Sequence, residues 1–442
     1  MIKNFVHLLA LMFICVNSHT QVCKVSINEK DGNWKLMVND EPYFIKGAGG
    51  DKYLDILIGA GGNTIRTWGT ENAQQVLDEA HKKGLKVMLG LWVQHERHGF
   101  DYNNKERVKA QLDRFRKEVQ KYKEHPALLL WGIGNEYELN YSNTKVWKAV
   151  NDIAKMIHEE DPYHPTSTVT AGTNADKLKF VMEELTEVDI YGINTYADIV
   201  NVKKVLKEGN FNGPYMITEW GPTGHWEIKK TMWGASVEQS STAKANSYLS
   251  RYKENIDSQK KQCIGSFAFL WGQKQEYTST WYGLFSEEGI PTEAIDVLQY
   301  CWKGSYPEKR SPSIDSLTFG AHSKLMNTIL VPGDKYSVQV YASDSNKDNL
   351  SYRWELYPES TDLKTGGDAE GKPPIITGKI KGGKSEKITL KAPTSEGRYR
   401  LFVFVTDGEK LAYMNVPFYV DDSLQEFNNV KFKIQDLEPT EY

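Results

Sequence analysis

Trp131-Gly-Ile-Gly-Asn-Glu136 is an apolar stretch that ends at a carboxylate, and Met216-Ile-Thr-Glu-Trp-Gly221 repeats this pattern farther along the chain. Each apolar run has the length and composition of a buried strand. In a parallel barrel, the carboxyl ends of the strands are where side chains leave the packed interior and face a ligand. We therefore predict that Glu136 and Glu219 lie at the same rim of an α/β barrel.

Strand-like and helix-like segments alternate around these two stretches. Strands are predicted over residues 43–47, 63–68, 86–92, 128–134, 165–170, 189–196, 214–219 and 265–271. Helices are predicted over residues 53–59, 71–84, 105–125, 147–161 and 292–301. Eight strands separated by helices favour a closed barrel over an open sheet. The sequence thus predicts a (β/α)8 TIM barrel over residues 24–305, with a hairpin within 24–42 that closes its bottom.

Two glutamates at one barrel rim can together cleave a glycosidic bond. One carboxyl group protonates the departing oxygen, and the other attacks the anomeric carbon. A retaining mechanism needs the two groups about 5–5.5 Å apart, whereas about 6.5–9.5 Å leaves room for an attacking water. The acid needs a raised pKa, which apolar surroundings and the second carboxylate would both provide. Glu136 and Glu219 are the predicted catalytic pair.

The barrel resembles the retaining glycoside hydrolases of clan A, in which an Asn-Glu pair ends strand four and a lone glutamate ends strand seven. The resemblance is strongest with the catalytic barrel of family 2, and it implies that Glu136 is the acid/base and Glu219 the nucleophile. Family 2 enzymes usually have a jelly-roll domain ahead of the barrel, and we expect none here. A barrel followed by an immunoglobulin-like domain looks more like the endo-β-1,3-glucanases of family 158 from gut Bacteroidetes.

The resemblance indicates the type of reaction more closely than the identity of the sugar. It favours an endo-β-1,3-glucanase acting on a laminarin-type β-glucan polysaccharide, with endo-β-mannanase, β-1,6-glucanase and β-galactosidase activities as alternatives. A glucan transglycosylase would use the same residues, because only the group that resolves the covalent intermediate differs. A non-catalytic glycan-binding protein is disfavoured because both glutamates and Arg66 are present.

Other residues near the strand ends are similar to supporting residues of the clan. Arg66 would hold Glu219 charged, with a structural salt bridge as the alternative, and Asn135 would bind a substrate 2-hydroxyl. Tyr196 is expected to donate to Glu219, and Trp271 to floor the subsite of the cleaved sugar, with core packing as the alternative for both. Further candidates for substrate binding are His95, Trp220 and Trp281.

Two long loops, 220–237 and 272–285, are rich in aromatic residues. Loops on the ligand-facing rim often carry the binding residues of a barrel. They predict an open cleft for more than one sugar, and hence attack within the polysaccharide chain.

The composition changes at residues 305–313, where prolines and charges indicate an exposed linker. Beyond it, apolar and polar residues alternate over 336–342, 350–356, 387–392, 397–405 and 412–420. Short alternating strands are typical of a β-sandwich. We predict an immunoglobulin-like domain over residues 313–421, either a glycan-binding module or, since no row of exposed aromatics is evident, a spacer packed on the barrel.

Charge and cysteine content argue against other classes. A net charge of −4 and a pI near 6.3 indicate neither a nucleic acid nor an anionic membrane as partner. Cys23, Cys263 and Cys301 form no CxxC pair, which argues against a zinc site. Cys263 and Cys301 flank the last strand and helix, and unlinked thiols are favoured over a disulfide. We expect no cofactor, no metal and a monomer.

Residues 1–20 have the layout of a cleaved signal peptide. A short basic start precedes the apolar run Phe5–Val16, which is shorter than the roughly 20 residues of a membrane span. Cleavage is expected after Ser18 or Thr20. A lipid anchor at Cys15 is the disfavoured alternative, because the preceding isoleucine is not the small residue that such a site needs. The protein is predicted to be secreted, periplasmic or on the cell surface, and not an integral membrane protein.

Overall fold

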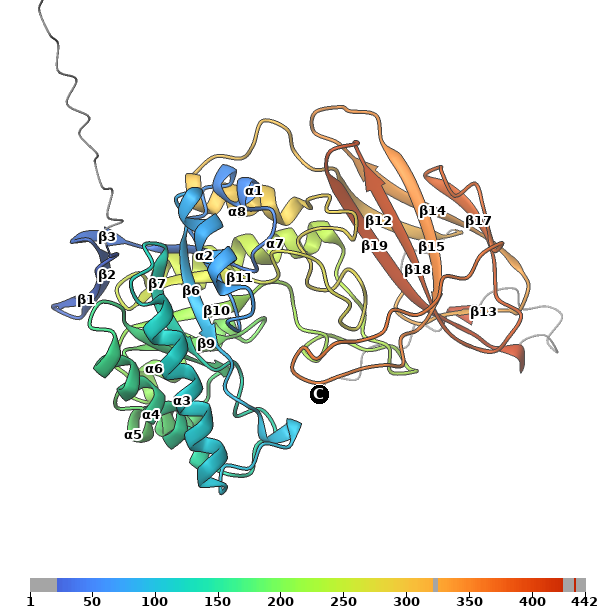
Figure 1. Ribbon diagram of the computed structural model, residues 1–442. Helices are drawn as coiled ribbons and strands as arrows, with labels where there is room; N and C mark the ends of the chain where they lie inside the picture. The colour runs from blue at the N-terminus through green and yellow to red at the C-terminus, as the bar shows by residue number, and fades with distance from the viewer. Residues whose placement is uncertain (1–21, 321–324, 424–432, 435–442) are drawn as a thin grey trace, which may run out of the picture.

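Eight parallel strands close into a barrel in the computed structural model, which describes residues 22–320, 325–423 and 433–434. The strands are β4 (Ile45–Gly49), β5 (Thr64–Arg66), β6 (Lys86–Leu91), β7 (Leu128–Ile133), β8 (Thr166–Ala171), β9 (Ile190–Asn194), β10 (Tyr215–Trp220) and β11 (Cys263–Ala268). They pair in chain order, and β11 returns to β4, which closes the barrel (Figure 1). The predicted (β/α)8 fold is confirmed. The predicted signal peptide and Cys15 lie outside the described residues.

Helices surround the barrel. They are α1 (Leu54–Gly59), α2 (Ala73–Lys82), α3 (Lys105–Tyr122), α4 (Lys145–Glu160), α5 (Ala175–Glu184), α6 (Ile199–Glu208), α7 (Ser241–Arg251) and α8 (Glu293–Lys303). Shorter helical turns span Glu96–His98, Tyr252–Ile256 and Asp257–Gln259. The predicted helices did not include α5, α6 and α7. The apolar patterns of α5 and α7 are weak, because α5 buries only Leu178 and Val181 and α7 buries the polar residues Ser241 and Lys244. The pattern of α6, which buries Ile199, Val202 and Leu206, is typical of an amphipathic helix.

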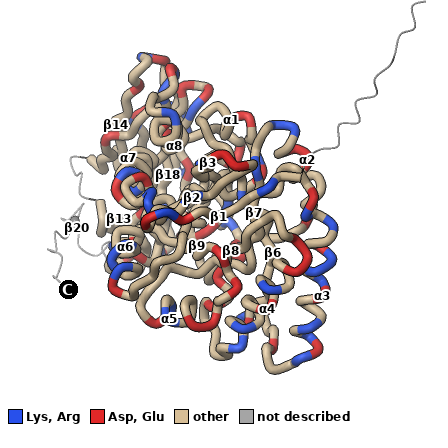
Figure 2. Tube along the Cα trace, turned by 90° about the vertical axis from the view of Figure 1, so that its left-hand side faces the viewer, with Lys and Arg blue, Asp and Glu red and all other residues tan. Residues whose placement is uncertain are grey.

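A three-stranded antiparallel sheet covers the bottom of the barrel. Its strands are β1 (Val25–Lys30), β2 (Asn33–Val38) and β3 (Glu41–Tyr43). Val25 and Leu36 join one hydrophobic cluster with barrel residues such as Met88 and Phe267. Figure 2 shows this sheet near the centre of a view turned by 90°, with acidic and basic residues interspersed on the helices around it. The opposite end of the barrel is thereby left as the rim that can hold a site.

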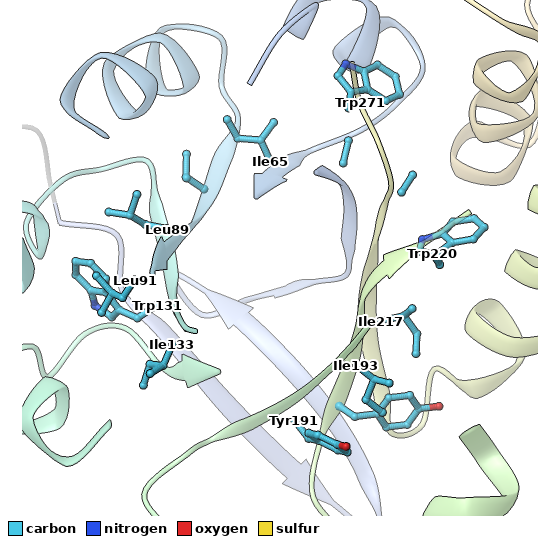
Figure 3. Packing of buried hydrophobic residues seen from close by; sticks show 14 of the residues in the cluster. Ile65, Leu89, Leu91, Trp131, Ile133, Tyr191, Ile193, Ile217, Trp220 and Trp271 are labelled. Atoms are coloured by element: carbon cyan, nitrogen blue, oxygen red, sulfur yellow. The ribbon is translucent and has the colours of Figure 1, made fainter. Parts of the chain in front are cut away.

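The largest part of the core lies between the strands and the helices. Figure 3 shows members of this cluster, among them Trp131 of β7, Tyr191 of β9, Trp220 of β10 and Trp271, which follows β11. Each of these four side chains is at most 2% exposed. Large aromatic residues thus pack the outer face of the barrel wall, where the helices cover it.

The C-terminal part is a β-sandwich, as predicted. One sheet holds β12 (Ser313–Phe319), β14 (Lys335–Ser343), β17 (Lys387–Lys391) and β16 (Ile380–Lys381). The other holds β15 (Ser351–Pro358), β18 (Gly397–Thr406), β19 (Leu411–Val420), β13 (Thr328–Leu330) and β20 (Lys433–Ile434). Alternate residues of both sheets, including Leu317, Val338, Leu401 and Phe418, form a core of their own.

The segment between the two domains is less exposed than predicted. Ser311 is buried, and its backbone N–H donates to Asp296 Oδ2 of α8 at 2.6 Å. The same aspartate accepts from Lys410 Nζ at 2.5 Å, near the start of β19. Asp296 therefore ties the linker and the sandwich to the barrel.

Two further sequence predictions concern membranes and thiols. Among the described residues, no helix combines the length and the apolar character that crossing a bilayer requires. Cys23, Cys263 and Cys301 are free thiols, so Cys263 and Cys301 form no disulfide.

Candidate active site

Glu136 and Glu219 open into one cavity of about 880 Å³ at the rim of the barrel. Glu219 lies within β10, and Glu136 follows β7 by three residues. The backbone of Glu136 has a left-handed φ of 50°, and its N–H donates to Val169 O of β8 at 2.9 Å. Such a conformation is uncommon for a non-glycine residue and is concentrated at functional sites. Here it turns the chain so that the carboxyl group enters the cavity.

The Glu219 carboxylate is surrounded by donors. Its Oε1 accepts from Arg66 Nη1 at 3.1 Å and from Trp68 Nε1 at 2.9 Å. Its Oε2 accepts from Tyr196 Oη at 3.1 Å. Arg66 is itself 1% exposed and also donates to Thr218 O at 2.7 Å. A buried guanidinium and two neutral donors are the partners of a carboxylate that carries its charge.

Glu136 has a different environment. Its Oε1 accepts a hydrogen bond from Asn194 Nδ2 at 2.9 Å. Burial and the charge of Glu219 raise the pKa of Glu136 from 4.5 to about 7. The carboxyl group can therefore hold a proton at neutral pH and release it under the same conditions. The two glutamates are chemically different although they share one cavity.

Two amides connect the carboxylates. Asn135 Oδ1 accepts from Arg66 Nη2 at 2.6 Å and from Asn194 Nδ2 at 3.1 Å. This leaves the amide NH₂ of Asn135, which lines the cavity, for a ligand oxygen. Asn194 Oδ1 accepts from Thr218 Oγ1 at 2.8 Å, which fixes the orientation of the amide that donates to Glu136.

The structure thus brings together Arg66, Asn135, Glu136, Tyr196 and Glu219, but it places four other predicted residues elsewhere. Trp220 packs on Tyr248 and Tyr252 beneath the helices. Its side chain points away from the cavity because successive side chains of a strand alternate and Glu219 takes the inner side. Trp220 is therefore a core residue and not part of the cavity lining.

Trp271, Trp281 and His95 are also outside the cavity lining. Trp271 packs against Phe285 and donates to Tyr53 O at 3.4 Å, and Trp281 donates to Thr223 O at 3.0 Å. Both are 1% exposed. His95 is fully buried between the rings of Trp92 and His98. Phe269, directly after β11, lines the cavity in place of Trp271.

Several lining residues were not predicted from the sequence, namely Trp68, Trp92, Asn194, Phe269, Lys274 and Glu276, together with the sandwich residues 364–367. Trp68 and Asn194 had a signal, because each stands two positions from a predicted residue on the same strand end. Trp226 belongs to the aromatic-rich loop 220–237, and it is 55% exposed at the cavity.

Among the described residues, the sandwich holds clusters of carboxylates. Two groups of three carboxylates lie close enough to share a cation, namely Asp344, Asp348 and Asp407, and Glu396, Asp421 and Asp422. Both groups lie in the sandwich, and their residues do not line the cavity.

Residues 65–304 match the family described as "Glycosyl hydrolases family 2, TIM barrel domain", which is more than half of the chain. The chain therefore belongs to this glycoside hydrolase family. A β-glucuronidase from Faecalibacterium prausnitzii is a structural relative at 18% identity and a TM-score of 0.50, over 64% of this chain and 52% of that one. A β-glucuronidase from Ruminococcus gnavus, in complex with uronic deoxynojirimycin, is similar at 16% identity and a TM-score of 0.51, over 63% of this chain and 52% of that one. The chain spans about half the length of these enzymes, and at such identities the likeness concerns the fold.

Proposed function

We propose that the protein is a retaining β-glycoside hydrolase that cleaves a neutral β-glucan internally, with β-1,3-glucan as the preferred substrate. The observation that carries this proposal is the difference between the two glutamates. Glu219 is held by three donors, and Glu136 has a pKa raised to about 7. One is suited to attack as a carboxylate, and the other to deliver a proton.

The proposed reaction has two displacements. In the first, a Glu219 oxygen bonds to the anomeric carbon while the glycosidic C–O bond breaks and the leaving oxygen takes the Glu136 proton. In the second, Glu136 removes a proton from water, whose oxygen bonds to the anomeric carbon as the bond to Glu219 breaks. Two inversions at one carbon retain the β configuration. Asn135 would donate to the 2-hydroxyl, and Arg66 would stabilise Glu219 when it leaves.

The charges of the cavity support a neutral substrate over a uronide. Both lysines of the lining already have a carboxylate partner: Lys274 lies 2.8 Å from Glu276, and Lys364 lies 2.5 Å from Asp362. The other charged residues of the lining are all acidic, namely Glu136, Asp198, Glu219, Glu227 and Glu276. A substrate carboxylate would be repelled there, although the structural relatives named above are β-glucuronidases.

The rings and the size of the cavity support an extended glycan. The lining includes the aromatic residues Trp68, Trp92, Trp226 and Phe269. Flat rings pack against the apolar faces of sugar rings, and a cavity of about 880 Å³ is at the upper end of the roughly 300–1,000 Å³ of ordinary ligand pockets. The preference for β-1,3-glucan rests on the resemblance to family 158, and endo-β-mannanase, β-1,6-glucanase and β-galactosidase activities remain its competitors.

A substrate panel tests the proposal. The protein is incubated with laminarin, a β-1,6-glucan, mannan, galactan and an aryl β-glucuronide, and the products are separated by size, with Glu219→Gln as the control. We expect laminarin to be shortened. Cleavage of the glucuronide alone would contradict the neutral substrate, and longer products would indicate a transglycosylase. Binding without any turnover would indicate a glycan-binding protein.

Export is part of the proposal, because residues 1–20 have the pattern of a cleaved signal. N-terminal sequencing of the mature protein should begin at His19 or Gln21. A chain that begins at Met1 would contradict export by cleavage.

A further inference from the structure

The cavity has a wall that the barrel does not supply. Residues 364–367, in the sandwich loop between β15 and β16, line the same cavity as Glu136 and Glu219. Figure 1 shows a loop of the sandwich that extends toward the barrel. This loop, residues 359–379, is called the strap below. Its presence at the site argues against a sandwich that only separates the barrel from other structures.

The strap is fastened to two rim loops of the barrel. Arg97, which follows β6, donates to Thr365 O and to Asp368 Oδ2, each at 2.8 Å. Lys274, which follows β11, donates to Gly367 O at 2.7 Å. Glu370 accepts from the backbone N–H of Tyr277 at 2.6 Å. The strands that these loops follow, β6 and β11, are separated by β4 and β5, so the contacts hold the strap across one side of the cavity.

The backbone of the strap lies directly against the barrel. Gly366 has a left-handed φ of 64°, and a methyl group added there would lie 2.9 Å from both Arg97 Nη2 and Leu139 Cδ2. Such distances are below van der Waals contact, so only glycine fits without a shift of the strap or of Leu139. The same loop contains a useful counterpart, because Gly378 also has a left-handed φ, of 73°, but nothing lies within 4 Å of an added methyl group.

A buried polar network anchors the strap to the barrel. Glu238, in the loop after β10, pairs with Lys244 at 2.5 Å and accepts from Asn415 Nδ2 of β19 at 2.6 Å. Arg400 of β18 donates to Ser236 O at 2.9 Å and pairs with Glu359, the first strap residue, at 2.6 Å. Every charged side chain in this network is at most 8% exposed. Breaking it would leave charges buried without partners, so the two domains are expected to behave as one unit.

The wall is chemically suited to sugar hydroxyls. Glu276 lines the cavity, is 7% exposed, and has a pKa raised by burial and by Glu219, with Lys274 acting in the opposite direction. The Lys364 ammonium group pairs with Asp362, but it is 47% exposed and has further N–H groups that can donate to a hydroxyl. Hydroxyl groups donate and accept, so a carboxylate and an ammonium group can both bind them. Both groups line the same cavity as Glu136 and Glu219.

We propose that the strap forms a glycan subsite, in which Lys364 and Glu276 bind hydroxyls of a sugar beyond the one that is cleaved. This inference rests on the proposed glycosidase function and assigns the sandwich a direct part in substrate selection. Binding energy from such a remote sugar serves the reaction only when the substrate is long enough to reach it.

The test compares matched variants on two substrates. Lys364→Ala and Gly366→Ala are measured against Lys384→Ala, an exposed lysine of the same sheet region, and Gly378→Ala. The substrates are a β-1,3-gluco-oligosaccharide derived from laminarin and an aryl β-glucoside. For Lys364→Ala and Gly366→Ala we expect kcat/KM on the oligosaccharide to fall about tenfold, as for the loss of a hydrogen bond to a charged group, and to stay within about twofold on the aryl glycoside. The control variants should match wild type on both.

Calorimetry with the oligosaccharide in the Glu219→Gln background separates this inference from the catalytic one. Weaker binding by the added Lys364→Ala or Gly366→Ala change would support the subsite even if wild type turned nothing over. Oligosaccharide binding and cleavage equal to those of the controls would overturn it, and so would equal losses on both substrates.

Discussion

Arg66 Nη1 lies 3.1 Å from Glu219 Oε1, and the two side chains are 2% and 7% exposed. The pair joins β5 to β10 across the interior of the barrel rim. A buried pair of this kind costs more when one partner is lost than it contributes intact, because the remaining charge is left without a partner.

Replacing Arg66 should therefore impair the reaction and also lower the stability of the fold, because the buried Glu219 carboxylate loses its cationic partner. We expect Arg66→Met to lower kcat/KM by about 100-fold or more, which is the scale of losing one preorganised electrostatic contact in an active site. Arg116→Met is the control, because its pair with Glu160 is half-exposed and contributes little. Circular dichroism checks that both variants fold. An Arg66→Met enzyme within about threefold of the control would contradict the assigned role.

The pKa of Glu136 predicts how activity depends on pH. Because the acid must be protonated to act, kcat/KM should decline as the pH rises above about 7. The Asn194 hydrogen bond lowers this pKa, so Asn194→Ala should move the alkaline limb to higher pH. A wild-type profile that stays flat up to about pH 9 would be inconsistent with Glu136 as the acid.

The same pKa has a consequence for stability. The folded-state pKa of Glu136 lies above its ordinary value of 4.5, so the folded state binds the proton more tightly than the unfolded state. The stabilisation from this proton is complete below about pH 4.5 and is lost as the pH rises toward about 7. Chemical denaturation gives the free energy of unfolding of Glu136→Gln minus that of wild type. This difference should be more positive at about pH 8 than at about pH 4. No change of that difference with pH would argue against the raised pKa.

The roles of the two glutamates make a separate prediction. Glu219→Gln should abolish turnover of every substrate, whereas Glu136→Gln should keep part of its activity on substrates whose leaving group needs no proton. Azide should rescue Glu136→Ala with a product of retained configuration and Glu219→Ala with an inverted one, as read by proton NMR. The opposite pair of configurations would mean that the roles are exchanged.

Whether a site residue could be predicted from the sequence depends on the kind of contact that places it there. Arg66, Glu136, Tyr196 and Glu219 were predicted to meet because the ends of parallel strands converge at one rim, and this convergence needs only the strand order. The placement of Trp220 at the cavity failed because side-chain alternation sends it to the helices. Trp271 was expected to stack on the sugar because a tryptophan of the clan does so at a similar position. In this chain Phe269 lines the cavity instead.

The contacts between the strap and the barrel could not be predicted from the sequence, for a different reason. Arg97 and Asp368 are 271 positions apart and belong to different domains. Neither residue has a distinctive neighbour pattern, so nothing local indicates that the two meet. The sandwich was predicted as a domain, either a glycan-binding module or a spacer packed on the barrel, but the sequence did not indicate that its loop lines the cavity.

Trp226 offers a test of the aromatic side of the cavity. It lines the cavity with 55% of its surface exposed, so an outer sugar can stack on it. We expect Trp226→Ala to lower kcat/KM on the polysaccharide by about tenfold, mainly through KM, because a stacked ring contributes about 1 kcal/mol or more. Tyr341→Ala, an exposed aromatic residue of β14 outside the lining, should have no effect. Equal behaviour of the two variants would remove Trp226 from the binding surface.

The stereochemistry and the site of attack can be read in one experiment. Glu136 and Glu219 are linked through Arg66 and Asn194, and we predict a separation of their carboxyl groups of about 5–5.5 Å, which leaves no space for a water between nucleophile and sugar. The first product should therefore keep the β configuration. Because the cavity and its strap have room for sugars beyond the cleaved one, long chains should be cut internally, and short substrates should lose kcat as well as affinity. Proton NMR during the first minutes of digestion identifies the anomer, and the size distribution of the early products identifies the point of cleavage. An initial α anomer would exclude the retaining mechanism, and single sugars as the only early product would exclude internal attack.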